Sequence, residues 1–321
     1  MTFLARLMVP FAFLWAAFAV GPAAAQPSPV PPGGAEVEPI AEGFQFTEGP
    51  YWLPGDDASS GTLLFSDVPA NTVYQWHPAT DSTSDSTSVY RRPSGRSNGI
   101  VAGANAGALL LAQHGWRRVA RVGPDGRETA LATRYDGKRF NSPNDVAVRS
   151  SDGTIYFTDP PYGVAEEARE LEVAGVYRLP PGRGRAPVLI TDQFERPNGI
   201  VLSPDADRLY VNGTRQGLIR AYDVAADGSV SGGDVFARLE DEDARGGPDG
   251  MTVDTEGRVY STGPGGLWIF APSGELLGRV RVPAQSTNVT FGSPENGTLF
   301  VTTPATVYRL DVDATGARRG R

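Results

Sequence analysis

Six residues with side-chain oxygens recur along the 321-residue chain at intervals of 39 to 54 residues. Each opens a short, largely apolar run; they are Glu48, Asn98, Asn144, Asn198, Asp249 and Asn288. Carboxylate and amide oxygens that converge on one point suit a hard divalent cation. The carboxylates of Glu48 and Asp249 would balance the charge of such an ion. Ca²⁺ fits best, because it accepts amide oxygens and irregular geometry, whereas Mg²⁺ demands a tighter octahedron.

The same dipeptides have a second interpretation, because Asn-Gly and Asp-Gly are also frequent in turns. Asp152-Gly153 and Asp227-Gly228 lie between apolar runs, where hairpin turns are expected. Asn98, Asn198 and Asp249 instead open the first run of a repeat. Their position in the repeat favours a metal-ligand role for these three residues but leaves the turn interpretation open.

Composition excludes several other kinds of site. The chain has no Cys, so it has no disulfide, thiolate nucleophile or Cys-ligated zinc. Its two histidines, His77 and His114, cannot form a three-His metal site. We find no phosphate-binding Gly-rich loop with Lys and no Gly-x-Ser-x-Gly elbow. The formal charge of −8 argues against a nucleic-acid partner, which requires a basic surface.

Short strands would have to position the six oxygens. In each repeat a turn and a second apolar run follow the first; the second runs are TLLFSD, ALLLAQ, TIYFTD, RLYVNG, RVYSTG and TLFVTT. Third and fourth runs follow in most repeats. Four strands in 40 to 50 residues are typical of a β-propeller blade, whose first strand lines the central channel. The sequence therefore predicts an all-β, six-bladed β-propeller with four-stranded antiparallel blades; the alternative is a β-sandwich with coincidental spacing.

The sixth repeat ends after its third strand, TVYRLDV. We expect Glu36–Phe46 to supply the missing strand and close the ring by pairing the N-terminal with the C-terminal part of the chain. We expect Val164–Val173 to form a loop over one face. Radial repetition leaves few exposed sheet edges, so a monomer is compatible with the pattern, although the oligomeric state stays open.

The N-terminal segment predicts export. Residues 1–25 combine Arg6, an apolar run and Ala23-Ala24-Ala25, which indicates a secretory signal peptide cleaved before Gln26. A membrane anchor is the alternative, but the apolar run is short for a span. We expect a periplasmic or secreted bacterial protein with no membrane contact after cleavage. Residues 26–36 predict a Pro/Gly-rich linker, and 37–321 a single propeller domain.

Several ordered motifs carry a family resemblance. Phe-Thr-Glu-Gly-Pro at 46–50, Arg-Phe-Asn-Ser-Pro-Asn-Asp at 139–145, Tyr-Phe-Thr-Asp-Pro-Pro-Tyr-Gly at 156–163, Pro-Asn-Gly-Ile at 197–200 and Pro-Asp-Gly-Met at 248–251 resemble the SMP-30/gluconolactonase/regucalcin family over residues 38–312. The resemblance implies a six-bladed propeller with one divalent cation. Family members differ in their ion, so Ca²⁺, Zn²⁺, Mg²⁺ and Mn²⁺ all remain candidates. The implied ligands are Glu48, Asn144, Asn198 and Asp249.

A cation at this site would polarise a lactone carbonyl and activate a water for attack. Asp249 is the expected general base, and His114 is the other catalytic candidate. Related propellers of the paraoxonase type carry two histidines in this blade, but Asn98 stands at the first of those positions here. Asn98 and Asn288 are expected to contact substrate or to support the ligands, and His77 to lie at the surface.

Three functions follow from this interpretation. The first is a metal-dependent hydrolase that opens a small, sugar-type lactone, as gluconolactonases do. The second is phosphotriester or other ester hydrolysis at the same site, which the related diisopropylfluorophosphatase implies. The third is a calcium-stabilised propeller that binds a ligand without turnover, because a fold does not fix a function.

Overall fold

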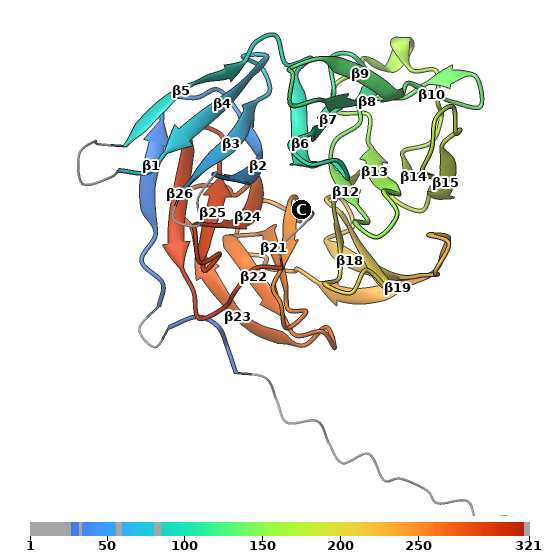
Figure 1. The fold of residues 1–321 in the computed structure, drawn as a ribbon. Coiled ribbons are helices and arrows are strands. Elements are labelled where there is room, and N and C mark those ends of the chain that lie inside the picture. Colours follow the sequence, from blue (N-terminus) through green and yellow to red (C-terminus); the bar gives the residue numbers. More distant parts are fainter. Residues whose placement is uncertain (1–26, 32–33, 56–59, 80–84, 318–321) are drawn as a thin grey trace, which may run out of the picture.

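The protein is a six-bladed β-propeller, as the sequence predicts. The computed structural model describes residues 27–31, 34–55, 60–79 and 85–317. Six four-stranded antiparallel sheets surround a central axis (Figure 1). A two-stranded hairpin, β10 (Arg134–Tyr135) with β11 (Lys138–Arg139), adds to them. The single helix of the described residues is a 3-10 turn, η1 (Glu166–Ala168), within the segment predicted as a loop.

The strands of each blade follow one another from the channel outward. Blade 1 consists of β2 (Thr47–Pro54), β3 (Gly61–Asp67), β4 (Thr72–His77) and β5 (Ser86–Arg91). Blade 2 consists of β6 (Ser97–Ala102), β7 (Leu109–Gln113), β8 (Arg118–Val122) and β9 (Glu128–Ala132). Blade 3 consists of β12 (Val146–Val148), β13 (Ile155–Asp159), β14 (Gly175–Leu179) and β15 (Val188–Thr191).

The second half of the ring repeats this order. Blade 4 consists of β16 (Pro197–Leu202), β17 (Arg208–Gly213), β18 (Leu218–Val224) and β19 (Val230–Arg238). Blade 5 consists of β20 (Met251–Val253), β21 (Val259–Gly263), β22 (Gly266–Phe270) and β23 (Leu276–Arg281). Blade 6 consists of β24 (Asn288–Gly292), β25 (Thr298–Thr302), β26 (Thr306–Asp311) and β1 (Glu38–Glu42).

The predicted closure is confirmed in blade 6. Strand β1 pairs with β26, so a strand from Glu36–Phe46 completes the last sheet. Glu38 lies opposite Arg309 in the register, and the arginine Nε donates to a Glu38 carboxylate oxygen at 2.7 Å. The first described strand thus joins the last one.

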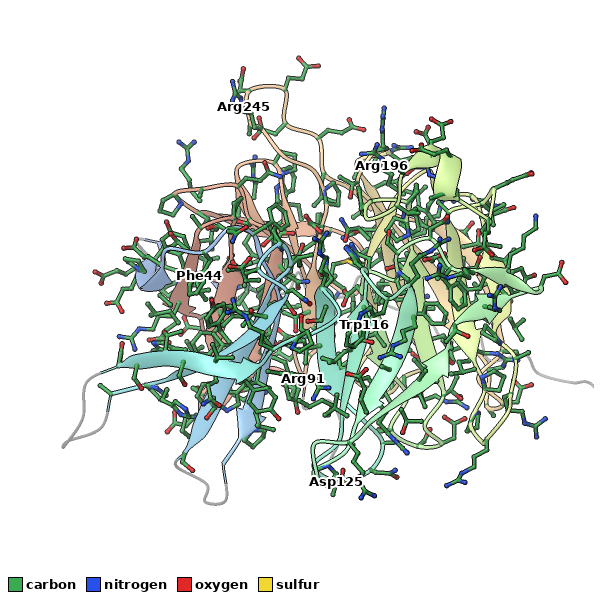
Figure 2. The ribbon with its side chains drawn as sticks, turned by 90° about the horizontal axis from the view of Figure 1, so that it is seen from above. Phe44, Arg91, Trp116, Asp125, Arg196 and Arg245 are labelled. Atoms are coloured by element: carbon green, nitrogen blue, oxygen red, sulfur yellow. The ribbon has the colours of Figure 1, made fainter. Side chains whose placement is uncertain are left out.

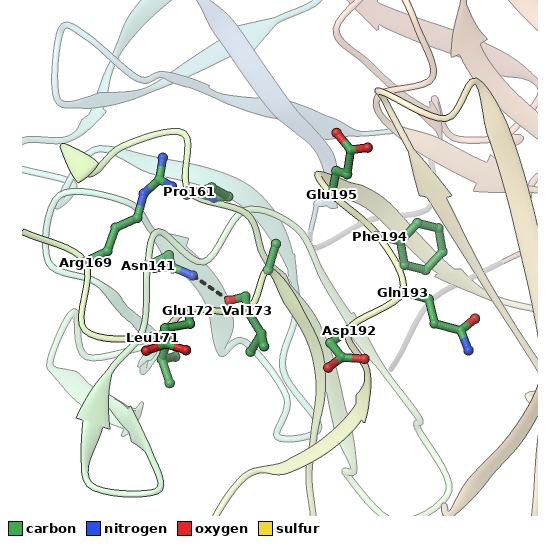
Figure 3. Close-up of a pocket in the computed structure, with 11 residues that line it drawn as sticks. Asn141, Pro161, Arg169, Leu171, Glu172, Val173, Asp192, Gln193, Phe194 and Glu195 are labelled. Atoms are coloured by element: carbon green, nitrogen blue, oxygen red, sulfur yellow. Dashed lines mark hydrogen bonds between the residues drawn. The ribbon is translucent and has the colours of Figure 1, made fainter. Parts of the chain in front are cut away.

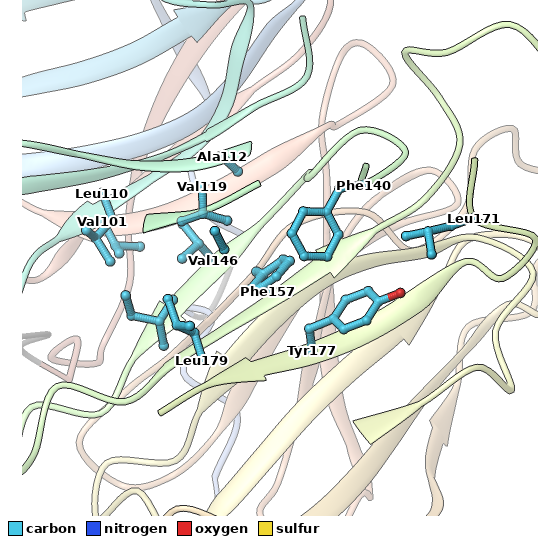
Figure 4. Packing of buried hydrophobic residues seen from close by; sticks show 12 residues of the cluster. Val101, Leu110, Ala112, Val119, Phe140, Val146, Phe157, Leu171, Tyr177 and Leu179 are labelled. Atoms are coloured by element: carbon cyan, nitrogen blue, oxygen red, sulfur yellow. The ribbon is translucent and has the colours of Figure 1, made fainter. Parts of the chain in front are cut away.

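Hydrophobic cores fill the spaces between neighbouring blades, because inner strands such as β7, β13 and β21 are buried on both faces. In β7, Leu109 and Leu111 face blade 1, whereas Leu110 and Ala112 face blade 3. This alternation follows from the two-residue period of a strand. Figure 4 shows the core between blades 2 and 3, where Phe157 and Tyr177 stack with ring centroids 5.4 Å apart. Two-sided burial explains why the innermost strands read as continuous apolar runs.

Part of the predicted linker lies against the propeller. Pro29 is buried, and Val30 and Ala35 pack against the core between blades 5 and 6. The predicted signal peptide and cleavage point lie outside the described residues, so both stay predictions. The described part of the chain contains no helix with the length and hydropathy needed to cross a bilayer. The run Asn98–Trp116, uncharged throughout, instead forms β6, β7 and the turns beside them.

Candidate active site where the innermost strands begin

All six oxygen-bearing residues lie at the start of an innermost strand or two residues before it. Glu48, Asn98, Asn198 and Asn288 belong to β2, β6, β16 and β24, and Asn144 and Asp249 lie two residues before β12 and β20. Five of the six are buried, and Asp249 is partly buried. We call them the ring residues. Their shared position is the one that the repeat register predicts.

The dipeptides that contain ring residues are not hairpin turns. The pairing of β6 with β7 shifts register between Ser97 and Ile100, and that of β16 with β17 shifts between Pro197 and Ile200. A bulge of this kind changes the direction of the side chains at that point. Asp152-Gly153 and Asp227-Gly228, in contrast, lie in turns between strands, as predicted.

The glycines of these dipeptides allow neighbouring blades to approach closely. A Cβ on Gly49 would lie 2.0 Å from the Asn98 carbonyl oxygen, and one on Gly250 would lie 2.0 Å from Asn288 Oδ1. Each of these two glycines therefore packs against the ring residue of the next blade. The close approach accounts for glycine at both positions, and a left-handed φ of +50° adds to it at Gly49.

Side chains of the second strands hold the ring backbone in place. Ser66 Oγ donates to the Asn98 carbonyl oxygen at 2.9 Å, and Thr158 Oγ1 donates to the Asn198 carbonyl oxygen at 2.7 Å. Asn212 Nδ2 donates to the Asp249 carbonyl oxygen at 2.6 Å. Each bond joins one blade to the next, so the ring side chains stand on a fixed backbone.

The ring concentrates negative charge in a desolvated space. Burial raises the pKa of Glu48 to about 7, although Asn288 Nδ2 donates to its Oε2 at 3.0 Å and thereby opposes the shift. Burial also raises the pKa of Asp249 well above its ordinary value, and the charges of Glu48 and Asp145 add to this effect. Mutual repulsion of buried carboxylates is the situation that a bound cation relieves.

Asp145 is a carboxylate of the site that the sequence analysis did not single out. Its Oδ1 accepts the Val146 N–H at 2.9 Å, and its Oδ2 accepts the Ile200 N–H of blade 4 at 3.1 Å. It follows a ring residue where blades 1, 2, 4 and 5 have glycine. The presence of a carboxylate where four other repeats have glycine is the sequence feature that could have identified Asp145.

The donor set fits a hard cation. Asp249 Oδ1 and Asn98 Oδ1 are buried oxygens without a hydrogen-bond partner among the described residues. Buried polar atoms without partners are uncommon in folded proteins and need an explanation. The described residues contain no group of three or more His, Cys, Asp or Glu side chains placed to hold a metal. Any ion would therefore depend on amide oxygens as well as carboxylates, which favours Ca²⁺ over softer ions.

His114 lies in the turn after β7, where its N–H donates to the Arg96 carbonyl oxygen at 3.2 Å. Its side chain is buried, its Nε2 has no partner among the described residues, and burial lowers its pKa to about 4. The imidazole is therefore neutral at pH 7. His77 lies on the third strand of blade 1, is partly exposed and shares a hydrogen bond with Thr62.

A wall of blades 3 and 4 borders the ring. Tyr162 donates from its hydroxyl to Thr214 Oγ1 at 3.1 Å, and Asn198 Nδ2 donates to the same oxygen at 3.0 Å. Thr214 Oγ1 in turn donates to the Pro248 carbonyl oxygen at 2.8 Å. Tyr162 lies in the loop after β13, and Thr214 lies in the turn after β17.

A separate pocket of about 380 Å³ lies next to this wall, between the loops that follow β13 and β15. Asn141, Leu171, Val173, Asp192 and Phe194 are among its lining residues (Figure 3). None of the six ring residues lines it. The pocket is therefore distinct from the ring.

Comparison with known proteins places this arrangement in a family. A family model of the SMP-30/gluconolactonase/LRE-like region matches residues 46–305. A gluconolactonase from Zymomonas mobilis subsp. mobilis is 35% identical over 300 residues, covering 85% of this chain and 80% of that protein. The solved structure of a gluconolactonase from Xanthomonas campestris is 32% identical, with a TM-score of 0.76 and coverage of 91% of this chain and 99% of that one. Regucalcin from Oryctolagus cuniculus is 28% identical over 276 residues, or 82% of this chain and 84% of that protein. The chain belongs to the SMP-30/gluconolactonase/LRE-like family.

Proposed function

We propose that the protein is a lactone hydrolase that opens a small, sugar-type lactone and depends on a divalent cation, Ca²⁺ in the first place. The gluconolactonases among its relatives support the reaction class. The single structural observation that carries the proposal is the unpartnered Asp249 Oδ1 in a ring of buried oxygen-bearing residues. The substrate, the ion and the mechanism are parts of this proposal.

Glu48, Asn144, Asn198 and Asp249 are the residues that would hold the ion. Such an ion would supply Lewis acidity to a lactone carbonyl and lower the pKa of a nearby water. Asp249 Oδ1 has no other partner among the described residues, so it can accept a proton from the attacking water. The water oxygen joins the carbonyl carbon, the ring C–O bond breaks, and the products are a hydroxycarboxylate and one proton.

The neutral side chains have supporting roles. The Asn98 amide can donate a hydrogen bond to the oxyanion that develops on the carbonyl oxygen, an interaction that stabilises the transition state. Neutral His114 can exchange a hydrogen bond with a substrate hydroxyl through Nε2. Asn288 donates to Glu48 and so fixes the orientation of that carboxylate.

The change Asp249→Asn tests the mechanism, because it keeps an oxygen ligand and removes the base. We expect a loss of about a hundredfold or more in kcat for glucono-1,5-lactone, the usual size of a general-base contribution. Ca²⁺ affinity, measured by calorimetry on the same protein, separates loss of the base from loss of the ion. His114→Gln should cost less than Asp249→Asn.

Two outcomes would contradict the proposal. Full turnover by Asp249→Asn with the ion bound would place the base elsewhere, with His114 as the next candidate. A wild-type protein that opens no lactone from a sugar-lactone panel at any loading with Ca²⁺, Mg²⁺, Mn²⁺ or Zn²⁺ would exclude the hydrolase.

A further inference from the structure

Two arginines occupy equivalent places in two blades. Arg96 lies two residues before Asn98, and Arg196 lies two residues before Asn198, in the segments RSNGIV and RPNGIV. The other four blades have Phe46, Ser142, Gly247 and Ser286 at this position. We propose that Arg96 and Arg196 form an anion-binding pair that selects lactones carrying an acidic substituent, a carboxylate or a phosphate. The inference rests on the proposed function and narrows its substrate class.

The backbone confirms that the two positions are equivalent. The Arg96 carbonyl oxygen accepts the N–H of His114 at 3.2 Å, and the Arg196 carbonyl oxygen accepts the N–H of Thr214 at 3.2 Å. Each acceptor is thus fixed to the residue that directly follows the second strand of its own blade. The two arginines therefore stand at the same height on blades 2 and 4, at the ring end of the innermost strands.

Arg196 is positioned by the wall of blades 3 and 4. Its guanidinium carbon lies 5.3 Å from the centroid of the Tyr162 ring, a cation–π distance. Tyr162 is 38% exposed and is fixed through Thr214 to ring residue Asn198. The guanidinium has no hydrogen bond or ion pair with another described residue, because the neighbouring Glu195 pairs instead with Arg215 at 3.9 Å. Arg196 therefore retains its donors for a ligand; Figure 2 shows it near one rim of the propeller.

Arg96 is held in a backbone conformation that non-glycine residues seldom adopt. Its φ is +50°, in the left-handed region. Asn71 Oδ1 accepts the Arg96 N–H at 2.7 Å and the Ser94 N–H at 3.2 Å, which fixes the loop. Such conformations persist where the surroundings impose them, and they are frequent at functional sites. The Arg96 side chain is exposed and makes no ion pair with a described residue.

One loop of blade 3 connects the two arginines. Tyr162 contacts Arg196, and a Cβ on the next residue, Gly163, would lie 3.3 Å from His114 Cβ. The His114 backbone is in turn bonded to Arg96. The order around the site is therefore Arg96, His114, Gly163, Tyr162 and Arg196.

The negative charge of the chain makes these two arginines important for the binding of an acidic substrate. The whole chain carries a formal charge of −8, and three carboxyl side chains, those of Glu48, Asp145 and Asp249, lie within the site. An acidic substrate would be repelled unless local cations offset that field. A guanidinium binds carboxylate or phosphate through two parallel hydrogen bonds, which a neutral sugar lactone cannot accept with comparable strength.

The test compares acidic and neutral ligands in the intact mature protein. The substrates are glucono-1,5-lactone, 6-phosphoglucono-1,5-lactone and glucaro-1,4-lactone, and the binding probes for calorimetry are gluconate, 6-phosphogluconate and glucarate. The variants are Arg196→Gln, Arg96→Gln and their combination. Arg183→Gln is the control, since Arg183 is exposed on the β14–β15 loop, at the opposite end of blade 3 from Tyr162.

We expect the wild-type protein to prefer at least one acidic lactone in kcat/KM. Each single variant should lose about fivefold or more for that lactone and for its open-chain acid, and the double variant should lose more. Glucono-1,5-lactone and gluconate should change by less than twofold, and Arg183→Gln should resemble the wild type. The phosphate and carboxylate probes show which acidic group is selected.

Equal effects on neutral and acidic ligands, or no effect beyond that of Arg183→Gln, would overturn the inference. The binding probes need no turnover. A protein that opens no lactone but binds 6-phosphogluconate or glucarate through Arg196 would contradict the proposed function while supporting the anion-binding pair. A protein that hydrolyses glucono-1,5-lactone, but whose binding of acidic ligands is unchanged by both arginine substitutions, would support the proposed function and contradict the anion-binding pair.

Discussion

Asp159 shows how burial sets the behaviour of a single residue away from the ring. It ends β13 with its side chain fully buried, and its Oδ2 accepts the Asn141 N–H at 2.7 Å. Burial raises the pKa of Asp159 to about 7, against smaller opposing effects of hydrogen bonds from the Asn141 and Ser142 N–H groups and of the Arg117 charge. Its Oδ1, Asn141 Oδ1 and the Tyr177 hydroxyl have no partner among the described residues. The ionised form of this carboxylate is therefore costly in the folded state.

This shift predicts a pH dependence of stability. Between pH 4 and pH 7 the folded protein retains a proton on Asp159 that the unfolded chain releases, so the free energy of unfolding falls as the pH rises. One pKa unit corresponds to about 1.4 kcal/mol, so Asp159→Asn should remove on the order of 2 kcal/mol of the decrease between pH 5 and pH 8. Urea unfolding at the two pH values measures it. An unchanged pH slope in Asp159→Asn, relative to exposed Asp227→Asn, would be inconsistent with this role.

At the scale of the elements, the decisive feature is how closely the innermost strands approach. A Cβ at residue 250 would meet Asn288 Oδ1 at 2.0 Å and Asn288 Cα at 2.6 Å, so backbone has to move. Overpacking of this kind costs about 1–3 kcal/mol. We therefore expect Gly250→Ala to lower the free energy of unfolding by that amount and to reduce activity as well.

The matched control is Gly297→Ala. There a Cβ would meet only the Ala314 carbonyl oxygen, at an ordinary 3.6 Å. Denaturant unfolding should find this variant within about 0.5 kcal/mol of wild type. Equal stability of the two alanine variants would refute a role for close blade approach.

The strands and blades could be predicted from the sequence, but several contacts between blades could not. The recurrence of Glu48, Asn98 and Asp249 predicted the blades and the innermost strands, because alternating apolar runs and turn residues are local signals. The bond from Asp145 to Ile200 and the contact between Gly49 and Asn98 were not predicted. Both join residues about 50 positions apart, and the packing of whole blades, rather than any local preference, determines them.

At the scale of the molecule, a bound cation should stabilise the whole ring, because it binds the folded ring and not the unfolded chain. At a concentration one hundred times Kd, such a ligand adds about 2.7 kcal/mol to stability. Chelation should therefore lower Tm and activity together, and Ca²⁺ should restore both. Glu48→Gln should show a smaller Tm difference between chelated and Ca²⁺-loaded samples. If chelation alters neither Tm nor turnover, the cation has no part in this protein.

Export is the other prediction at this scale. The charged start, apolar run and small residues of 1–25 predict cleavage after Ala25. N-terminal sequencing of the exported protein should begin at Gln26. A membrane-bound product that retains Met1 would instead support the anchor.

The pairing of β1 with β26 has a consequence for how the chain folds. Glu38 and Arg309 are 271 residues apart in the sequence, so the ribosome completes one partner long before the other. Until β26 pairs with β1, the sixth sheet lacks its outer pairing and has open strand edges. Contacts of such high contact order form slowly, and unpaired edges invite aggregation in the meantime. The ring can therefore close only when β26 is available to pair with β1.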